Sequence, residues 1–219
     1  MVEIAIALGV IALALVAIVG VLPLGLNLQR ENRDETIINQ EGLYFLEAIR
    51  SGGVGYDLTN AVYELGVMTT NVTTGDVSTN YIQFNGGFPA TGSNIIGHLS
   101  TPKGLIYVPN GEPIEKNLAK VRAQSGTATE IAGNNNDLAF TYLLAVEVQP
   151  LPGLNPNPGY NANDLRQNLY EVRLTCHWPL LPGDRVGRNR KVFRTHVSGK
   201  LQRSGGYFYF NPLSYTNAP

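Results

Sequence analysis

The side chains that could carry chemistry are few in this 219-residue chain. Its histidines are His98, His177 and His196. His177 and His196 lie on neighbouring predicted strands and could face each other as metal ligands, but no third ligand is evident beside them. The Asn and Asp run at 134–137 lacks the alternating ligands of a calcium loop and is typical of a turn. We therefore expect no metal site.

The sequence contains no catalytic motif. It has no phosphate-binding glycine loop, no serine in a nucleophile elbow and no paired metal motif. The single cysteine, Cys176, excludes an intrachain disulfide and fits a small buried apolar side chain. With 16 Lys and Arg against 17 Asp and Glu, the net charge is -1, so no nucleic-acid partner is expected. We predict a protein that is not an enzyme and needs no cofactor.

Glu3 is the acidic residue with the most unusual neighbours. It stands before a run from Ile4 to Gln29 that has no charged side chain. As a helix, the part from Ile4 to Leu26 would span roughly 35 Å, which is enough to cross the hydrocarbon core of a bilayer. A carboxylate at the edge of such a span is costly unless it reaches the interface or finds a partner. Glu3 is therefore a candidate functional residue.

Three interpretations of the apolar run are open: a cleavable signal, a permanent membrane anchor, or a helix that leaves the membrane for a filament. No Lys or Arg precedes the run, which disfavours a cleavable signal. Gly20, Pro23 and Gly25 weaken a helix locally, which is unusual for a simple anchor. In a packed bundle this soft joint could extend, so we expect the assembled helix to lose regular hydrogen bonds between Gly20 and Leu26.

The helix is expected to continue beyond the apolar run as an amphipathic segment. Charged residues begin at Arg30, and one face then carries Ile37, Ile38, Phe45, Ala48 and Ile49. Ser51, Gly52 and Gly53 supply a stop. We therefore predict that residues 1–53 form a hydrophobic and then amphipathic helical spine.

Residues 54–219 are richer in Gly, Pro, Asn, Ser and Thr and have short strand-like runs. A short helix is possible at 56–67, and strands are predicted at 80–84, 104–108 and 138–148. The clearest hairpin joins 168–179 to 190–202, because Tyr170, Val172, Leu174, Cys176 and Trp178 alternate with polar residues. We predict an α+β fold, with a long N-terminal helix followed by a β-rich globular head that contains an antiparallel sheet.

Two parts of the predicted head are candidate contact surfaces. The Pro/Asn/Gly-rich loop at 149–164 is long for a compact domain. The aromatic run Tyr207, Phe208, Tyr209 and Phe210 could complete the sheet or form a contact surface. In addition, Asn71 begins an Asn-Val-Thr sequon that could accept a glycan.

The N-terminal sequence resembles the mature N-terminus of type IV pilins and pseudopilins. Glu3, the unbroken run IAIALGVIALALVAIVG, the helix breakers Gly20 and Pro23, and the long continuing helix carry this resemblance. The stretch VEIAIALGVIALALVAIVGVLPLGL is most similar to prepilin-like proteins of the Verrucomicrobia and relatives, and 168–201 fits them less specifically. Glu3 lies two residues nearer the start than the family's glutamate, and Met1 stands where the mature family member usually has a methylated phenylalanine.

The resemblance implies that the helices bundle into the apolar core of a filament. Glu3 would meet the terminal amine at Met1 of a neighbour, and a wrong stagger would leave a charge buried alone. It implies assembly roles for Met1, Glu3, Gly20, Pro23 and Gly25. The expected protein is a structural subunit of an extracellular type IV pilus-like filament. Its partners would be copies of itself, the inner membrane before assembly, and the pilus assembly machinery.

Three alternatives to an abundant filament subunit are considered. A minor pseudopilin of a secretion-type fibre would share the N-terminal helix. A monomeric membrane-anchored binding domain would use the helix only as an anchor. A membrane-anchored enzyme is disfavoured, because the sequence has no catalytic constellation.

Overall fold

The computed structural model describes residues 2–56, 58–71, 73–82, 92–103, 114–124, 140–151 and 168–215, with the backbone alone described at 21–24. The chain divides into two compact units, Met1–Asn39 and Gln40–Pro219, which we call the N-terminal unit and the C-terminal unit. This division lies inside the first helix, whereas the change in composition places the expected division after residue 53.

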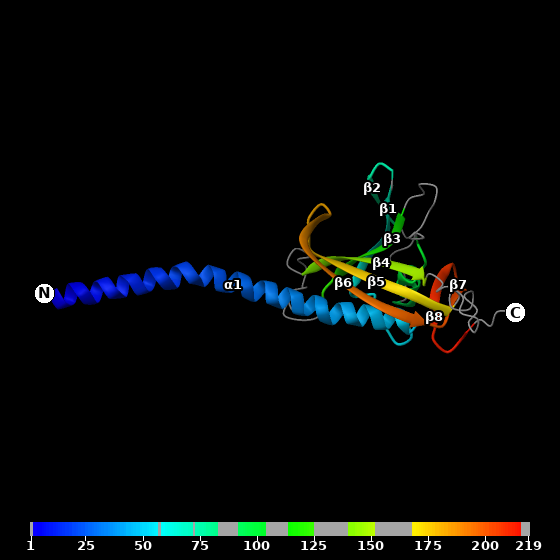
Figure 1. Ribbon diagram of the computed structural model, residues 1–219, viewed down its shortest axis with the longest axis horizontal. Coiled ribbons are helices and arrows are strands. Elements are labelled where there is room, and N and C mark those ends of the chain that lie inside the picture. The colour runs from blue at the N-terminus through cyan, green and yellow to red at the C-terminus, as the bar shows by residue number, and fades with distance from the viewer. Residues whose placement is uncertain are drawn as a thin grey trace, which may run out of the picture. The chain divides into compact units, whose positions relative to one another are not determined.

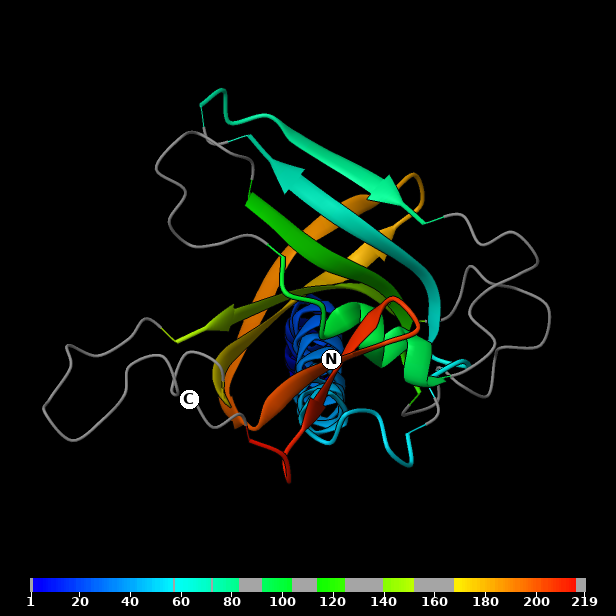
Figure 2. The same cartoon turned by 90° about the vertical axis from the view of Figure 1, so that its right-hand side faces the viewer.

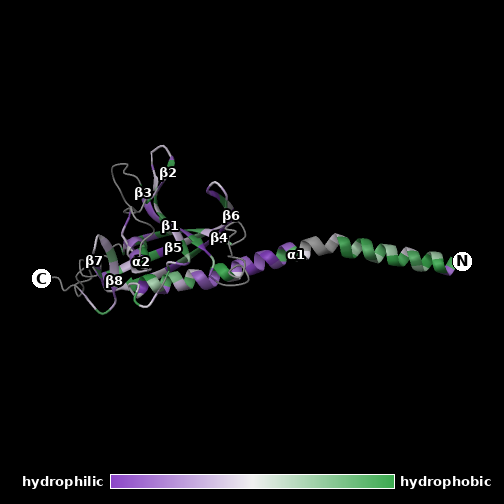
Figure 3. Ribbon diagram, turned by 180° about the vertical axis from the view of Figure 1, so that it is seen from behind, coloured by the Kyte–Doolittle hydropathy of each residue, from purple (hydrophilic) through white to green (hydrophobic). Residues whose placement is uncertain are grey.

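The first element is one uninterrupted helix, α1 (Val2–Arg50) (Figure 1). Its N-terminal part is apolar and is followed by a polar stretch (Figure 3). The backbone stays helical through Gly20, Pro23 and Gly25. The expected loss of hydrogen bonds in this segment concerns the assembled state, so it stays a prediction.

The end of α1 follows the predicted pattern. Gly52 and Gly53 adopt positive φ angles of 70° and 79°, which glycine reaches without steric cost. The N–H of Gly53 donates to the carbonyl oxygen of Ala48 at 2.9 Å and satisfies a carbonyl of the last turn. The predicted apolar stripe is also confirmed, because its members are all buried: Ile37, Ile38, Phe45, Ala48 and Ile49.

The C-terminal unit contains a six-stranded antiparallel sheet in the order β2-β1-β3-β4-β5-β6. The predicted α+β architecture is therefore confirmed. The strands of this sheet are β1 (Val62–Thr70), β2 (Val77–Tyr81), β3 (Ile114–Arg122), β4 (Thr141–Pro150), β5 (Leu169–Leu181) and β6 (Arg185–Ser198).

The core of the C-terminal unit lies between this sheet and the last turns of α1. Figure 2 shows the strands curving around that part of the helix. On β5 the apolar set alternates as predicted, and Val172, Leu174, Cys176 and Trp178 are buried. A short helix, α2 (Gly92–Leu99), and a separate two-stranded sheet, β7 (Lys200–Ser204) with β8 (Tyr207–Asn211), complete the unit.

Two expectations are wrong. Residues 56–67 do not form a helix, because strand β1 begins at Val62. The buried side chains of Leu58, Ala61, Val62 and Leu65 have helical spacing in the sequence, but the first two lie in a turn before the strand. His177 and His196 do not face each other across the hairpin, because His177 pairs with Arg190 and His196 pairs with Glu171.

The other predicted strands have mixed outcomes. The segment 138–148 is confirmed as β4, and the hairpin is confirmed as β5 and β6. The segment 80–84 overlaps only the end of β2. The predicted strand 104–108, the Asn/Asp run 134–137 and most of the loop 149–164 lie outside the described residues.

Candidate functional site

The apolar part of α1 is an extended surface of exposed aliphatic side chains. Each of its described large apolar residues exposes at least 55% of its surface: Val2, Ile4, Ile6, Leu8, Val10, Ile11, Leu13, Leu15, Val16, Ile18, Val19, Leu26 and Leu28. The helix is long and apolar enough to cross a membrane. A surface this apolar is unfavourable in water, so lipid or other protein must cover it.

Other predicted assembly residues lie on the same helix. Glu3 is exposed in the first turn, where the partial positive charge of the helix N-terminus favours a carboxylate. A methyl group added at Gly20 or Gly25 would meet nothing within 4 Å. The helix is therefore open to a close neighbour at these glycines. Met1 and the side chain of Pro23 lie outside the described parts of the chain.

Glu41 is a buried carboxylate that the sequence interpretation did not single out. Its side chain accepts a hydrogen bond from the Tyr142 hydroxyl at 2.6 Å and another from the backbone N–H of Gln124 at 2.6 Å. It therefore ties the end of α1 to β4 and to the end of β3. The signal was present in the sequence, because Glu41 follows Ile38 by three residues and precedes Phe45 by four on the buried stripe.

The buried carboxylate affects two nearby acids. Burial raises the pKa of the Tyr142 hydroxyl well above its usual value, and the negative charge of Glu41 raises it further. Burial, with a smaller effect of Glu41, raises the pKa of the Cys176 thiol to about 12. Cys176 is therefore the inert, buried side chain expected from the sequence, with little thiolate available for reaction.

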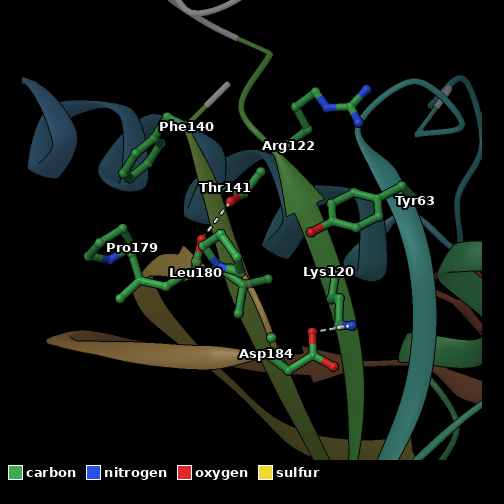
Figure 4. Close-up of a pocket in the computed structure, with 11 residues that line it drawn as sticks. Tyr63, Lys120, Arg122, Phe140, Thr141, Pro179, Leu180 and Asp184 are labelled. Carbon is green, nitrogen blue, oxygen red and sulfur yellow. Dashed lines mark hydrogen bonds and ion pairs between the residues drawn. The ribbon is translucent and has the colours of Figure 1, made fainter. Parts of the chain in front are cut away.

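A pocket of about 460 Å³ lies where the turn between β5 and β6 approaches β1 and β3 (Figure 4). Lys120 stands at one side of it, and its ammonium lies 2.6 Å from a carboxylate oxygen of Asp184 and 2.6 Å from one of Glu64. The ammonium also lies 3.8 Å from the centre of the Tyr81 ring. Burial lowers the pKa of Lys120, but hydrogen bonds to Asp184 and Glu64 outweigh burial and raise it overall.

The remaining pocket wall is mostly apolar. Phe140, Leu180 and the Pro179 and Pro182 rings contribute to it. The Thr141 hydroxyl donates to the carbonyl oxygen of Leu180 at 3.0 Å and holds the strands in place. The described lining residues include no histidine, cysteine or serine. A largely apolar hollow with one paired ammonium has the composition of a binding site for a small group.

The histidines have structural surroundings. His98 lies on α2 with its Nε2 atom 3.0 Å from the carbonyl oxygen of Gly66, and burial lowers its pKa. Burial also lowers the pKa of His177, assisted by the positive charges of Arg190 and Lys116. Among the described residues, no three His, Cys, Asp or Glu side chains lie close enough to share a metal ion.

The aromatic run forms β8 and packs partly inside the C-terminal unit. Phe210 is buried, and its ring lies 5.4 Å from that of Tyr170. A methyl group added at Gly97 of α2 would lie only 2.6 Å from Tyr207 and Tyr209. Phe208 instead lies beside Arg203, whose guanidinium is 5.9 Å from the ring centre. The strand therefore packs on α2, and it joins β7 rather than the main sheet.

Asn71 lies at the turn between β1 and β2. Its side-chain oxygen accepts hydrogen bonds from the backbone N–H groups of Thr73 at 2.9 Å and Thr74 at 3.2 Å. These bonds form an Asx-type turn, which explains an asparagine here without a glycan. Asn71 is exposed, so its side chain is accessible from the solvent.

Comparison with protein-family models, with curated proteins and with solved structures finds no match to this chain. Its function is therefore inferred from its own sequence and geometry.

Proposed function

We propose that this chain is the structural subunit of an extracellular filament of the type IV pilus class, assembled through the apolar part of α1. The observation that carries the proposal is the exposed apolar surface of the described residues 2–20 and 25–28, on a helix that continues into a folded C-terminal unit. Bundling these helices would remove that surface from both water and lipid. Relative to exposure to water, an aliphatic helix side chain gains about 1.5–3 kcal/mol on full burial, and the surface carries many of them.

Glu3 supports a filament over a permanent anchor. Its exposed carboxylate stands in front of the uncharged run and has no need to be there in a simple span. In the proposed bundle it pairs with the terminal amine of a neighbouring copy and fixes the stagger between subunits. Before assembly the helix resides in the inner membrane, and the pilus assembly machinery transfers it to the filament at the cell surface.

The pocket beside Lys120 favours a second candidate, a monomeric membrane-anchored binding domain. The pocket is present in the folded chain, and its wall combines aromatic and proline side chains with the ion-paired ammonium of Lys120. Such a domain would use α1 only for anchorage. The two candidates, and the minor pseudopilin that shares the helix, differ in how many copies of α1 lie side by side.

Disulfide crosslinking within α1 distinguishes these candidates. The double substitution Leu13→Cys with Leu15→Cys places two thiols on roughly opposite sides of the exposed apolar helix, so that each subunit can join two neighbours. The native Cys176 is buried and should not react. Oxidation of filaments sheared from the cell surface should give a ladder of crosslinked species, because a helical bundle brings neighbouring helices together. The unsubstituted chain is the control and should remain monomeric.

Two outcomes would contradict the main proposal. Crosslinking of the double-cysteine variant that stops at monomer and dimer, with all the protein in the membrane fraction, would indicate an anchored domain. Filaments in which this chain is a trace component would indicate a minor subunit. Electron microscopy and mass spectrometry of the sheared material measure both.

A further inference from the structure

The edge strand β6 carries a concentration of positive charge that the filament role does not use. The stretch from Arg185 to Arg203 contains no Asp or Glu, and its basic residues are Arg185, Arg188, Arg190, Lys191, Arg194, Lys200 and Arg203. Arg185, Arg188, Arg190 and Arg194 are all exposed, and we call these four the basic edge. Because the net charge of the whole chain is -1, this is a local feature.

Neighbouring cations on the sheet are neutralised, and those of the basic edge are not. Lys116, Lys120 and Arg173 each lie within 3.5 Å of a carboxylate oxygen on an adjacent strand or turn. None of the four basic-edge arginines forms an ion pair with a carboxylate in the described part of the chain. Four guanidinium groups are thus available for an anion from outside.

The strand places two of these charges, Arg190 and Arg194, on one face. Arg190 and Arg194 point to the face opposite Phe193, whose ring packs toward Gly42 of α1. They lie beside His177 and Arg173 on β5, and Arg190 contributes to the lowered pKa of His177. At about 3.4 Å per residue, these two arginines stand roughly 14 Å apart along an exposed strand. The geometry fits an extended chain of anionic groups better than a single ion.

The other edge of β6 offers neutral hydrogen-bonding groups. β6 is the last strand of the sheet, so no described strand pairs with its outer backbone N–H and C=O groups. Sugar hydroxyls can satisfy such groups, since they both donate and accept. Arginine also presents a planar pair of donors that matches a carboxylate in a two-bond contact.

We propose that the basic edge binds an acidic polysaccharide, with its arginines pairing with sugar carboxylates and the free strand edge bonding to hydroxyls. Single-stranded nucleic acid fits less well, because Phe193 faces the helix and the exposed face of β6 carries no Phe, Tyr or Trp ring for base stacking. Duplex DNA fits less well because the chain as a whole is slightly acidic. Charged side chains that only keep an edge strand from pairing with another chain would not need to be arginine, since lysine serves that purpose.

The test compares two charge-matched double variants of the full chain in neutral detergent. Arg190→Gln with Arg194→Gln removes two charges from the basic edge. Arg30→Gln with Arg50→Gln removes two exposed charges from α1 and is the control. Binding to polygalacturonate, to the neutral polymer dextran and to duplex DNA is measured at increasing salt. Fluorescence of the single tryptophan, Trp178, reports that each variant is folded.

The unsubstituted chain should bind polygalacturonate at low salt, lose affinity as salt screens the charges, and ignore dextran. The basic-edge variant should bind about tenfold more weakly or worse, and the control should change by no more than about twofold. Equal binding by the basic-edge variant, or no binding by the unsubstituted chain at low salt, would overturn the proposal. Tighter binding to duplex DNA than to polygalacturonate at equal charge concentration would overturn the polysaccharide assignment.

Discussion

Glu41 places a carboxylate where the end of α1 meets the sheet, at only 6% exposure. Replacing it with alanine would leave the Tyr142 hydroxyl and the Gln124 N–H without their hydrogen-bond acceptor. We expect Glu41→Ala to lower the free energy of unfolding by about 3 kcal/mol. Urea unfolding followed by Trp178 fluorescence measures this. Glu47→Ala, at an exposed site on the same helix, is the control and should cost less than about 0.5 kcal/mol. A similarly small loss of unfolding free energy in Glu41→Ala would show that the hydrogen bonds of Glu41 do not stabilise the contact between α1 and the sheet.

Cys176 makes a pH-dependent contribution to stability. The pKa of its thiol rises from 9.0 in the unfolded chain to about 12 in the fold, chiefly through burial. The folded state therefore keeps the proton that the unfolded state loses above pH 9. Stability from this site is complete below pH 9 and falls as pH rises toward 12.

By pH 10 the loss from Cys176 should be about 1.4 kcal/mol relative to pH 7. Comparing unfolding free energies of the native chain and Cys176→Ala at both pH values isolates it, because burial and Glu41, the main causes of the raised pKa of Tyr142, are present in both chains. The alanine variant should lose less stability between pH 7 and pH 10. Parallel pH profiles would show that the thiol ionises alike in both states.

These residues show why the sequence predicts some of the site and not the rest. Glu3 is a candidate that the sequence offers by itself, because its neighbours in the chain are apolar, which is a local property. The place of Glu41 on the apolar stripe marks its burial, but its partner Tyr142 is 101 residues away, so nothing local in the sequence shows that it is paired. The carboxylates of Asp184 and Glu64 likewise become one site only when Lys120 of β3 lies between them.

At the scale of elements, strands with one buried face could be predicted from the sequence. The irregular turn that precedes a strand could not. The alternation on β5 gave the right strand because each second side chain from Val172 to Trp178 faces the core. The region before β1 was misread because Leu58 and Ala61 are buried in a turn. Burial in a turn imitates helical periodicity, and only the tertiary context separates the two.

The packing of β8 on α2 gives an element-scale prediction. A methyl group at Gly97 would come within 2.6 Å of Tyr207 and Tyr209. Gly97→Ala improves helix propensity but forces these tyrosines away, so we expect a net loss of about 2 kcal/mol in unfolding free energy. Gly25→Ala on α1 meets nothing within 4 Å and should not destabilise the C-terminal unit. Urea unfolding monitored at Trp178 compares them, and an unchanged or stabilised Gly97→Ala would contradict this packing.

At the scale of the whole molecule, the two units differ in whether they have a hydrophobic core of their own. The C-terminal unit has its own core of fully buried side chains, among them Tyr142, Leu144 and Leu174. The large apolar side chains described in the apolar part of α1 are exposed. We expect a truncated chain beginning at Gln29 to be soluble, monomeric and cooperative in thermal unfolding. Size-exclusion chromatography and circular dichroism test this. Persistent aggregation, or no thermal transition, would mean that the C-terminal unit depends on filament neighbours.

In the proposed filament, Glu3 is the residue whose loss should impair assembly most. Inside a bundle of apolar helices, removing one member of a buried ion pair leaves the other charge unpaired at a cost of about 3–5 kcal/mol. Glu3→Ala should therefore nearly abolish filaments while the thermal transition of the C-terminal unit stays unchanged, because Glu3 is exposed in the single chain. Glu31→Ala removes an exposed acid from the same helix and should leave filament number unaltered. Counting filaments by electron microscopy, with melting curves of each variant, separates assembly from folding. Normal filament numbers in Glu3→Ala would show that the carboxylate pairs with nothing in the bundle.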